Sequence, residues 1–275
     1  MKWITVSRRM GTQGSAIAKQ VASELGYRFY DTEAIGQMAQ ELSVLDPVQP
    51  ADETAGSAFQ QIFSQRPIVY LERLASALYE VARQGDAVFL GRGSHVLLRE
   101  FPCALHVWVT ASPESRIRTL LHQGWARDAA VRAIKRSDDE RSAVVKFAFG
   151  VDWEDPARYD LVLNMDKLPV PVAVSTVLHV VRSPAISDAS TEALRALGLL
   201  ALTRRAEAAL LEASVGHGFS ASLSVAAVAP GVVRVSGEVE APERRTAAEN
   251  ILRGVKGVES VENAIRVALR RRPGA

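Results

Sequence analysis

The chain has 275 residues, of which 48% are hydrophobic and 23% are charged, and its formal net charge at pH 7 is only +2. This length exceeds the usual size of a single domain, so we expect one large or two smaller domains with a proper hydrophobic core. The chain lacks the strong basic excess of a nucleic-acid-binding protein, so we do not expect it to bind nucleic acid.

Cys103 is the only cysteine, so neither an intrachain disulfide nor a cysteine-based zinc site can form. No charged leader with an apolar core precedes the first predicted strand, and no stretch reaches about 18 uninterrupted apolar residues. These features predict a cytoplasmic protein without a transmembrane segment.

The first 26 residues predict a strand, a loop and a helix. An apolar run at 3–7 leads into a turn with two glycines, and apolar residues at helical spacing follow until Gly26. Such a loop directs backbone N–H groups and the positive end of the helix dipole at one point, which suits a phosphate. The candidate phosphate contacts are Gly11, Thr12, Gln13, Gly14 and Ser15. A generic strand-to-helix turn without a ligand is an equal alternative from these residues alone.

The loop is an incomplete Walker A sequence. When G-x-x-x-x-G-K-[ST] is laid over residues 8–15, only Ser15 fits, as a hydroxyl that would hold magnesium. Arg8 stands at the first glycine, Gln13 at the second, and Gly14 at the lysine.

The following pattern alternates short apolar strands with helices. The predicted strands are 27–31, 87–90, 103–109 and 160–164, and the predicted helices are 32–45, 67–84, a short one ending at 99, 115–147 and 170–181; 46–57 is a predicted loop. Together with the first strand, this order predicts a doubly wound parallel sheet. Ligands of such sheets bind beyond the carboxyl ends of the strands. The glycine-containing loop at 9–15, which we call the phosphate loop, falls there, as do Asp31 and Arg92.

Several charged residues are candidates for phosphate or metal contacts. Arg92 lies between two glycines after a buried strand, where it could hold a phosphate as a bidentate fork or be a surface arginine in a flexible turn. The arginine-rich stretch 115–147 is either a solvated face with ion pairs or a lid that closes over a nucleotide. Within it Asp138, like Ser15, is a candidate magnesium ligand.

A different pattern begins after a small, polar, proline-containing linker at 183–190. A helix at 191–213, strands at 222–229 and 232–239, a helix at 241–253 and a strand within 258–269 predict a small α+β unit of order αββαβ. We therefore expect domains at 1–182 and 191–270.

The segments "ITVSRRMGTQGSAIAKQVASELGYRFYD", "VFLGRGSHVLL" and "RSDDERSAVVKFAFGVDWEDPARYDLVLNM" resemble the cytidylate-kinase-like proteins, a branch of the P-loop nucleoside monophosphate kinases. The resemblance covers residues 1–182. It implies a five-stranded parallel sheet of order 2-3-1-4-5 with helices on both faces, with ATP and Mg²⁺ as cofactors. It also implies a nucleoside monophosphate as acceptor, with Asp31 and Arg92 as its contacts.

Two departures from true cytidylate kinases bear on catalysis. Gly14 replaces the Walker lysine, so Arg8 or Arg9 would have to serve in its role, and Lys135, Asp138 and Arg141 are the nearest match to the arginine–aspartate–arginine signature of the lid. By this resemblance Arg8, Lys135 and Arg141 are the catalytic candidates. The missing lysine leaves two functions open: an ATP-dependent kinase of a monophosphate such as CMP, or an inactive pseudokinase that senses nucleotides.

The C-terminal unit resembles a BON domain. The resemblance rests on "VRVSGEV" at 233–239, the helix after Pro242, "GVESV" at 257–261 and Asn263. It implies a small ligand, a lipid surface or a protein as the partner of this unit, which would regulate the first domain.

Overall fold

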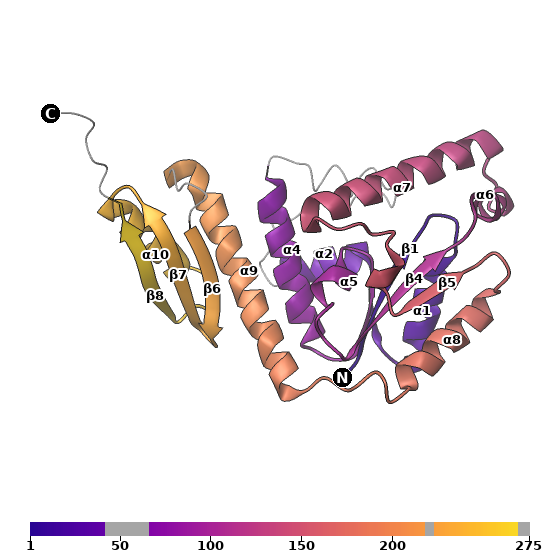
Figure 1. Cartoon of the computed structure of the whole chain (residues 1–275), viewed down its shortest axis with the longest axis horizontal. Helices are drawn as coiled ribbons and strands as arrows, with labels where there is room; N and C mark the ends of the chain where they lie inside the picture. Colours follow the sequence, from indigo (N-terminus) through magenta and orange to yellow (C-terminus); the bar gives the residue numbers. More distant parts are fainter. Residues whose placement is uncertain (42–65, 218–222, 269–275) are drawn as a thin grey trace. The chain divides into compact units, whose positions relative to one another are not determined.

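The computed structural model describes residues 1–41, 66–217 and 223–268, so the predicted loop at 46–57 lies outside the described residues. These residues form two compact units (Figure 1). Unit 1 holds residues 1–38 and 84–193, and the other described residues belong to unit 2.

A five-stranded sheet forms the centre of unit 1. Its strands are β1 (Trp3–Arg8), β2 (Arg28–Tyr30), β3 (Ala87–Leu90), β4 (Ala104–Thr110) and β5 (Leu161–Asn164). The order is β2-β3-β1-β4-β5, and every neighbouring pair is parallel. The predicted sheet and its strand order are confirmed. Because all strands run the same way, the segments after β1, β3 and β4 emerge at one edge.

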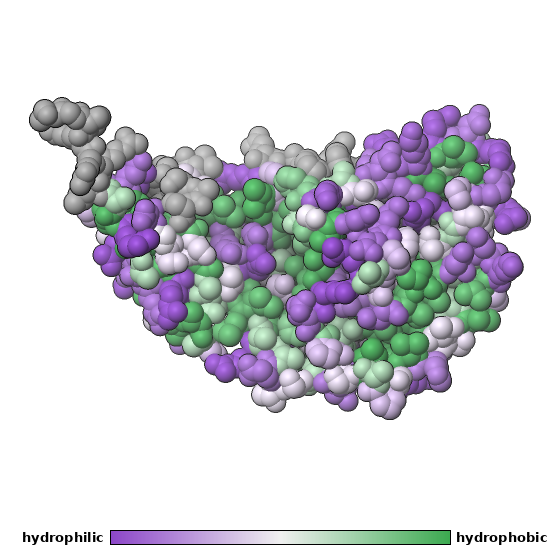
Figure 2. Space-filling model, viewed as in Figure 1, coloured by the Kyte–Doolittle hydropathy of each residue, from purple (hydrophilic) through white to green (hydrophobic). Residues whose placement is uncertain are grey.

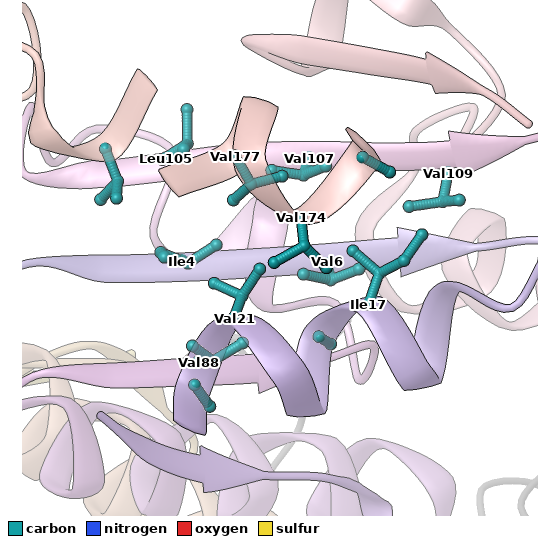
Figure 3. Close-up of a cluster of buried hydrophobic side chains, with 14 of the residues drawn as sticks. Ile4, Val6, Ile17, Val21, Val88, Leu105, Val107, Val109, Val174 and Val177 are labelled. Carbon is teal, nitrogen blue, oxygen red and sulfur yellow. The ribbon is translucent and has the colours of Figure 1, made fainter. Parts of the chain in front are cut away.

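Helices cover this sheet and connect its strands. They are α1 (Gly14–Leu25), α2 (Thr32–Glu41), α5 (Ser94–Leu97), α6 (Pro113–His122), α7 (Arg127–Phe149) and α8 (Val170–Arg182), with a 3-10 turn, η1 (Pro156–Arg158). On one face Ile17 of α1 and Val174 of α8 interlock with alternate strand residues such as Val6 and Val107 (Figure 3). The opposite face carries Ser7 and Trp108, which are partners in the β1–β4 register.

The arginine-rich stretch is two helices, not the single helix predicted over 115–147. α6 ends where Gly124 adopts φ 88°, and the Trp125 N–H donates to the Leu120 carbonyl at 3.1 Å. The Gly124 N–H also donates to the Leu121 carbonyl at 3.0 Å, which completes a Schellman motif. The helical periodicity continues through the stretch, but a glycine in the left-handed region ends the first helix.

Unit 2 contains the predicted αββαβ unit. It consists of α9 (Thr191–His217), β6 (Leu223–Ala229), β7 (Val232–Val239), α10 (Pro242–Arg253) and β8 (Ser260–Val267). Strand β7 is central, antiparallel to β6 and parallel to β8. Leu202 and Ala206 of α9 and Leu252 of α10 pack with Val233 and Val235 of β7.

Unit 2 also contains α4 (Pro67–Ala82), although this helix lies between β2 and β3 along the chain. The Ser76 hydroxyl donates to the Ala201 carbonyl of α9 at 2.8 Å. Ion pairs join Glu72 to Arg204 at 3.1 Å and Glu80 to Arg205 at 3.2 Å. The compact units therefore do not follow the predicted domain boundaries, and separate folding of 1–182 and 191–270 stays a prediction.

A search of the described helices finds none long and apolar enough to cross a membrane.

Candidate functional site

Between β1 and α1, carbonyl groups accept hydrogen bonds from side chains, whereas amide N–H groups are left available to a ligand. The carbonyl oxygens of Arg8, Arg9 and Met10 accept hydrogen bonds from Arg141 Nη1 (2.6 Å), Thr12 Oγ1 (2.8 Å) and Arg116 Nε (2.7 Å), respectively. Within the described part of the chain, the amides of residues 11–15 have no hydrogen-bond acceptor. Open amides at the positive end of a helix are what an anion such as phosphate requires.

Two glycines allow the close approaches in this loop. A Cβ on Gly11, whose φ is 82°, would lie 2.8 Å from the Arg116 carbonyl oxygen. A Cβ on Gly14 would lie 2.5 Å from the Cβ of Arg8. Both distances are too short for any real Cβ, so each position requires glycine as the structure stands.

The Arg8 side chain occupies the space that a side chain at position 14 would need. A Cβ on Gly14 would lie 3.1 Å from the Arg8 Cγ, and a Cβ on Gly91 would lie 2.8 Å from the Arg8 Nη1. The side chain therefore runs from the phosphate loop to the turn after β3. This geometry explains the departure from Walker A: an arginine at position 8 and a lysine at position 14 exclude each other sterically.

Arg92 is the residue after Gly91, which lies at the end of the Arg8 side chain. Arg92 has φ 57° and is partly buried. Among the described residues its buried Nε has no hydrogen-bond partner. A donor of this kind, on a residue adjacent to Gly91 in the chain, is suited to an incoming anion.

Asp31 has a local structural role. One of its carboxylate oxygens accepts a hydrogen bond from the Ala34 N–H at 3.0 Å, which caps the start of α2. The other oxygen is the one that could contact a ligand.

Helices α6 and α7 bring two arginines to the loop. Arg116 is only 1% exposed and forms a bidentate ion pair with Asp138, with distances of 2.7 and 2.9 Å. Arg141, one turn further along α7, is partly buried, and this burial lowers the pKa of its guanidinium while Asp138 raises it. Lys135 is exposed on α7, where hydrophilic residues gather (Figure 2). The structure thus brings Arg8, Asp138 and Arg141 to the loop and leaves Lys135 in solvent.

The sequence analysis placed Arg116 in the arginine-rich stretch, as part of a solvated face or a lid, and gave it no role of its own. The signal was present, because Arg116 lies beside Ile117 and one turn before Leu120, the two apolar residues of α6 that are buried. An arginine on the apolar side of a short helix needs a buried partner, and Asp138 provides it.

A cluster of stacked aromatic rings lies beside the loop, on the face of the sheet that carries Ser7 and Trp108. The rings of His95 and Trp108 each stack on Tyr159, with centroid distances of 5.1 and 5.7 Å. The Ser7 Oγ and His95 Nδ1 are 3.3 Å apart, and burial lowers the pKa of His95 to about 4. Arg9 lies 5.7 Å over the Trp108 ring, so it is engaged here while Arg8 points to the turn.

The residues that could hold magnesium are few. In the described ranges no group of three or more His, Cys, Asp or Glu side chains could hold a metal ion. Ser15, partly buried at the start of α1, offers a hydroxyl, whereas both oxygens of Asp138 are bound by Arg116. Ser15 fits a magnesium ion whose remaining ligands are phosphate oxygens and water.

A model of the cytidylate kinase-like family matches residues 3–167, more than half of the chain. The chain belongs to this family. Residues 201–268 match the BON domain, so the predicted combination of a cytidylate-kinase-like region and a C-terminal BON domain is confirmed.

Several solved structures are similar to part of this chain. An uncharacterized protein from Eubacterium ventriosum is 20% identical, with a TM-score of 0.53, and the match covers 66% of this chain and 97% of that one. Shikimate kinase from Bacteroides thetaiotaomicron is 15% identical with a TM-score of 0.42, covering 66% of this chain and 99% of that one. Deoxyadenosine kinase from M. mycoides is 11% identical with a TM-score of 0.37, covering 66% and 100%. No curated protein matches the chain.

Proposed function

We propose that this cytidylate-kinase-like protein transfers a phosphoryl group from ATP to a nucleoside monophosphate, with CMP as the first acceptor to test. The observation that carries the proposal is the segment after β1, where side chains bind the carbonyls of residues 8–10 while the amides of residues 11–15 remain open. This arrangement suits the donor phosphates of a nucleotide.

Arg8 is the residue that we assign to the role of the absent Walker lysine. Its stem lies where a side chain at position 14 would begin, and its guanidinium extends to Gly91. A cation between the donor loop and the Arg92 turn would stabilise negative charge on a phosphoryl group that moves from one to the other. Arg141, beside the same loop, would add to that field, whereas the exposed Lys135 would do so only from solvent.

The remaining roles follow from position. Ser15 and the loop amides would hold the donor phosphates and their magnesium ion, which supplies charge neutralisation when bound. Arg92 and Asp31 would hold the acceptor, Arg92 through its phosphate. The BON domain would bind a small ligand, a lipid surface or a protein and regulate the kinase.

A nucleotide-sensing pseudokinase is the second candidate. The favouring observation is that Asp138, the acidic residue at the nearest match to the lid signature, pairs with Arg116 through both of its oxygens, so that its charge is already balanced by an arginine. In that case ATP would bind to the loop without transfer.

A coupled kinase assay over a panel of nucleoside monophosphates, with calorimetry for ATP–Mg²⁺, tests both candidates. The parent should phosphorylate at least one acceptor, and Arg8→Met should lower turnover by about 10²-fold or more, as loss of one transition-state contact does elsewhere. Arg132→Met, at an exposed arginine of α7, is the control and should change turnover little. ATP binding without any turnover would favour the sensor, and absence of ATP binding would refute both candidates.

A further inference from the structure

Two arginine side chains, Arg116 and Arg141, connect the phosphate loop to α6 and α7. Arg116 of α6 donates through Nε to the Met10 carbonyl and through both Nη atoms to Asp138 of α7. Arg141 of α7 donates to the Arg8 carbonyl at 2.6 Å. One guanidinium therefore joins three segments that are distant in the sequence.

Apolar packing supports the same connection. The Met10 side chain packs on a buried cluster formed by Ile117 and Leu120 of α6 and Ala130 and Ile134 of α7. Gly11 lies so close to Arg116 that a Cβ would come within 2.8 Å of its carbonyl oxygen. The loop is thus seated on the α6–α7 pair by its side chains and by its backbone.

We infer that Arg116 and Asp138 are positioning residues of the anion site: their ion pair holds the Met10 carbonyl away from the ligand and thereby keeps the amides of residues 11–15 open. This inference rests on the proposed donor-phosphate site, and it adds that the position of α7 controls how well this site binds an anion. Asp138, predicted as a metal ligand, acts here through Arg116. A shift of α7 that breaks the pair would release the Met10 carbonyl and weaken anion binding.

Asp138→Asn distinguishes positioning from simple electrostatics, because the two effects have opposite signs. Removal of a negative charge near an anion site strengthens anion binding if only Coulomb attraction matters. Loss of the Arg116 ion pair loosens the loop and weakens binding. We expect binding to weaken by about 3- to 30-fold, the range of coupling through packed networks.

The probe is inorganic triphosphate, titrated by calorimetry into the full chain in the presence of EDTA, so that no metal contributes. Asp139→Asn is the matched control, because Asp139 is the next residue, is exposed, and carries the same charge. It should bind triphosphate as the parent does or slightly more tightly. Melting curves confirm that each variant is folded, and Asp138→Glu, which retains the charge but moves the carboxylate, replaces Asp138→Asn if the latter is unfolded. Asp138→Glu should bind triphosphate at least about threefold more weakly than the parent, again within the range of such coupling.

The outcomes separate this inference from the proposed function. If triphosphate binds more weakly to the Asp138 variant but not to the Asp139 control, the positioning role is supported. A failure to phosphorylate any monophosphate would overturn only the proposed kinase activity. Equal or tighter binding in the folded Asp138 variant overturns the positioning role. A parent that does not bind triphosphate overturns both the anion site and this inference.

Discussion

Gly14→Ala is expected to destabilise unit 1 only while Arg8 is present. The added Cβ would lie 2.5 Å from the Arg8 Cβ and 3.1 Å from its Cγ. Carbon atoms in contact normally lie about 3.5–4.0 Å apart, so the end of β1 and the start of α1 must separate by about 1 Å. Overpacking of this kind costs about 1–3 kcal/mol.

The backbone effect has the opposite sign. Gly14 lies in the first turn of α1 and is not among the residues with positive φ, so alanine is conformationally allowed there. Replacement of glycine by alanine in a helix stabilises it by up to about 1 kcal/mol. Gly14→Ala alone should therefore lower the free energy of unfolding by up to about 2 kcal/mol.

Most of the clash is removed in an Arg8→Gly background, because the two nearest atoms belong to Arg8 and only the Val109 Cβ, at 3.2 Å, remains close. There the same Gly14→Ala change should be neutral or stabilising by up to about 1 kcal/mol, so the two substitutions should couple by roughly 1–3 kcal/mol. By the same reasoning Gly14→Lys alone should abolish ATP binding, whereas Arg8→Gly with Gly14→Lys, which restores two Walker A residues, should retain it.

Urea unfolding followed by tryptophan fluorescence measures this coupling. All four tryptophans, Trp3, Trp108, Trp125 and Trp153, lie in unit 1, so the signal reports on that unit. Additive effects of the two substitutions, within about 0.5 kcal/mol, would refute the steric argument.

Three other predictions follow from the structure. Arg92→Ala should weaken CMP binding by roughly ten- to hundredfold, the value of a charge-assisted bidentate contact, and leave ATP binding nearly unchanged; equal CMP affinities by calorimetry would remove Arg92 from the site. Burial lowers the pKa of His95 from 6.5 to about 4, so unit 1 should lose about 3 kcal/mol of its free energy of unfolding as the pH falls from about 6.5 to about 4. His95→Gln should reduce this loss in fluorescence-detected melts. The fragment 1–182 lacks the α9 partners of Ser76, Glu72 and Glu80, so it should melt below the full chain in calorimetry; an equal melting temperature would show that the first domain is complete without α9.

Much of the fold was predictable because it depends on local patterns. Short apolar runs bounded by turn residues located the strands of the sheet, and Gly26 marked the end of the first helix correctly, because it has φ 69° directly after α1. The break at Gly124 was missed, because apolar spacing continues across it and only the left-handed glycine ends the helix.

The candidate site was predictable in its location but not in its contacts. Parallel strands place their carboxyl ends at one edge, so the phosphate loop and the Arg92 turn were expected together. The partners of Asp138 and Arg141 were not predictable, because an acidic or basic residue on a helix has the same local pattern whether it faces solvent or a buried partner. Burial of Arg116 decided which interpretation holds for Asp138.

The sequence by itself determined the order of strands and helices, the glycine loop before α1, and the absence of a lysine at position 14. These properties depend on residues close together in the chain. Only the tertiary structure decided that the Arg8 stem takes the place of that lysine, that Arg116 and Arg141 hold the loop carbonyls, and that α4 packs on α9. The physical reason is the same in each case: steric exclusion, burial and ion pairing act between segments that only the folded chain brings within a few ångströms.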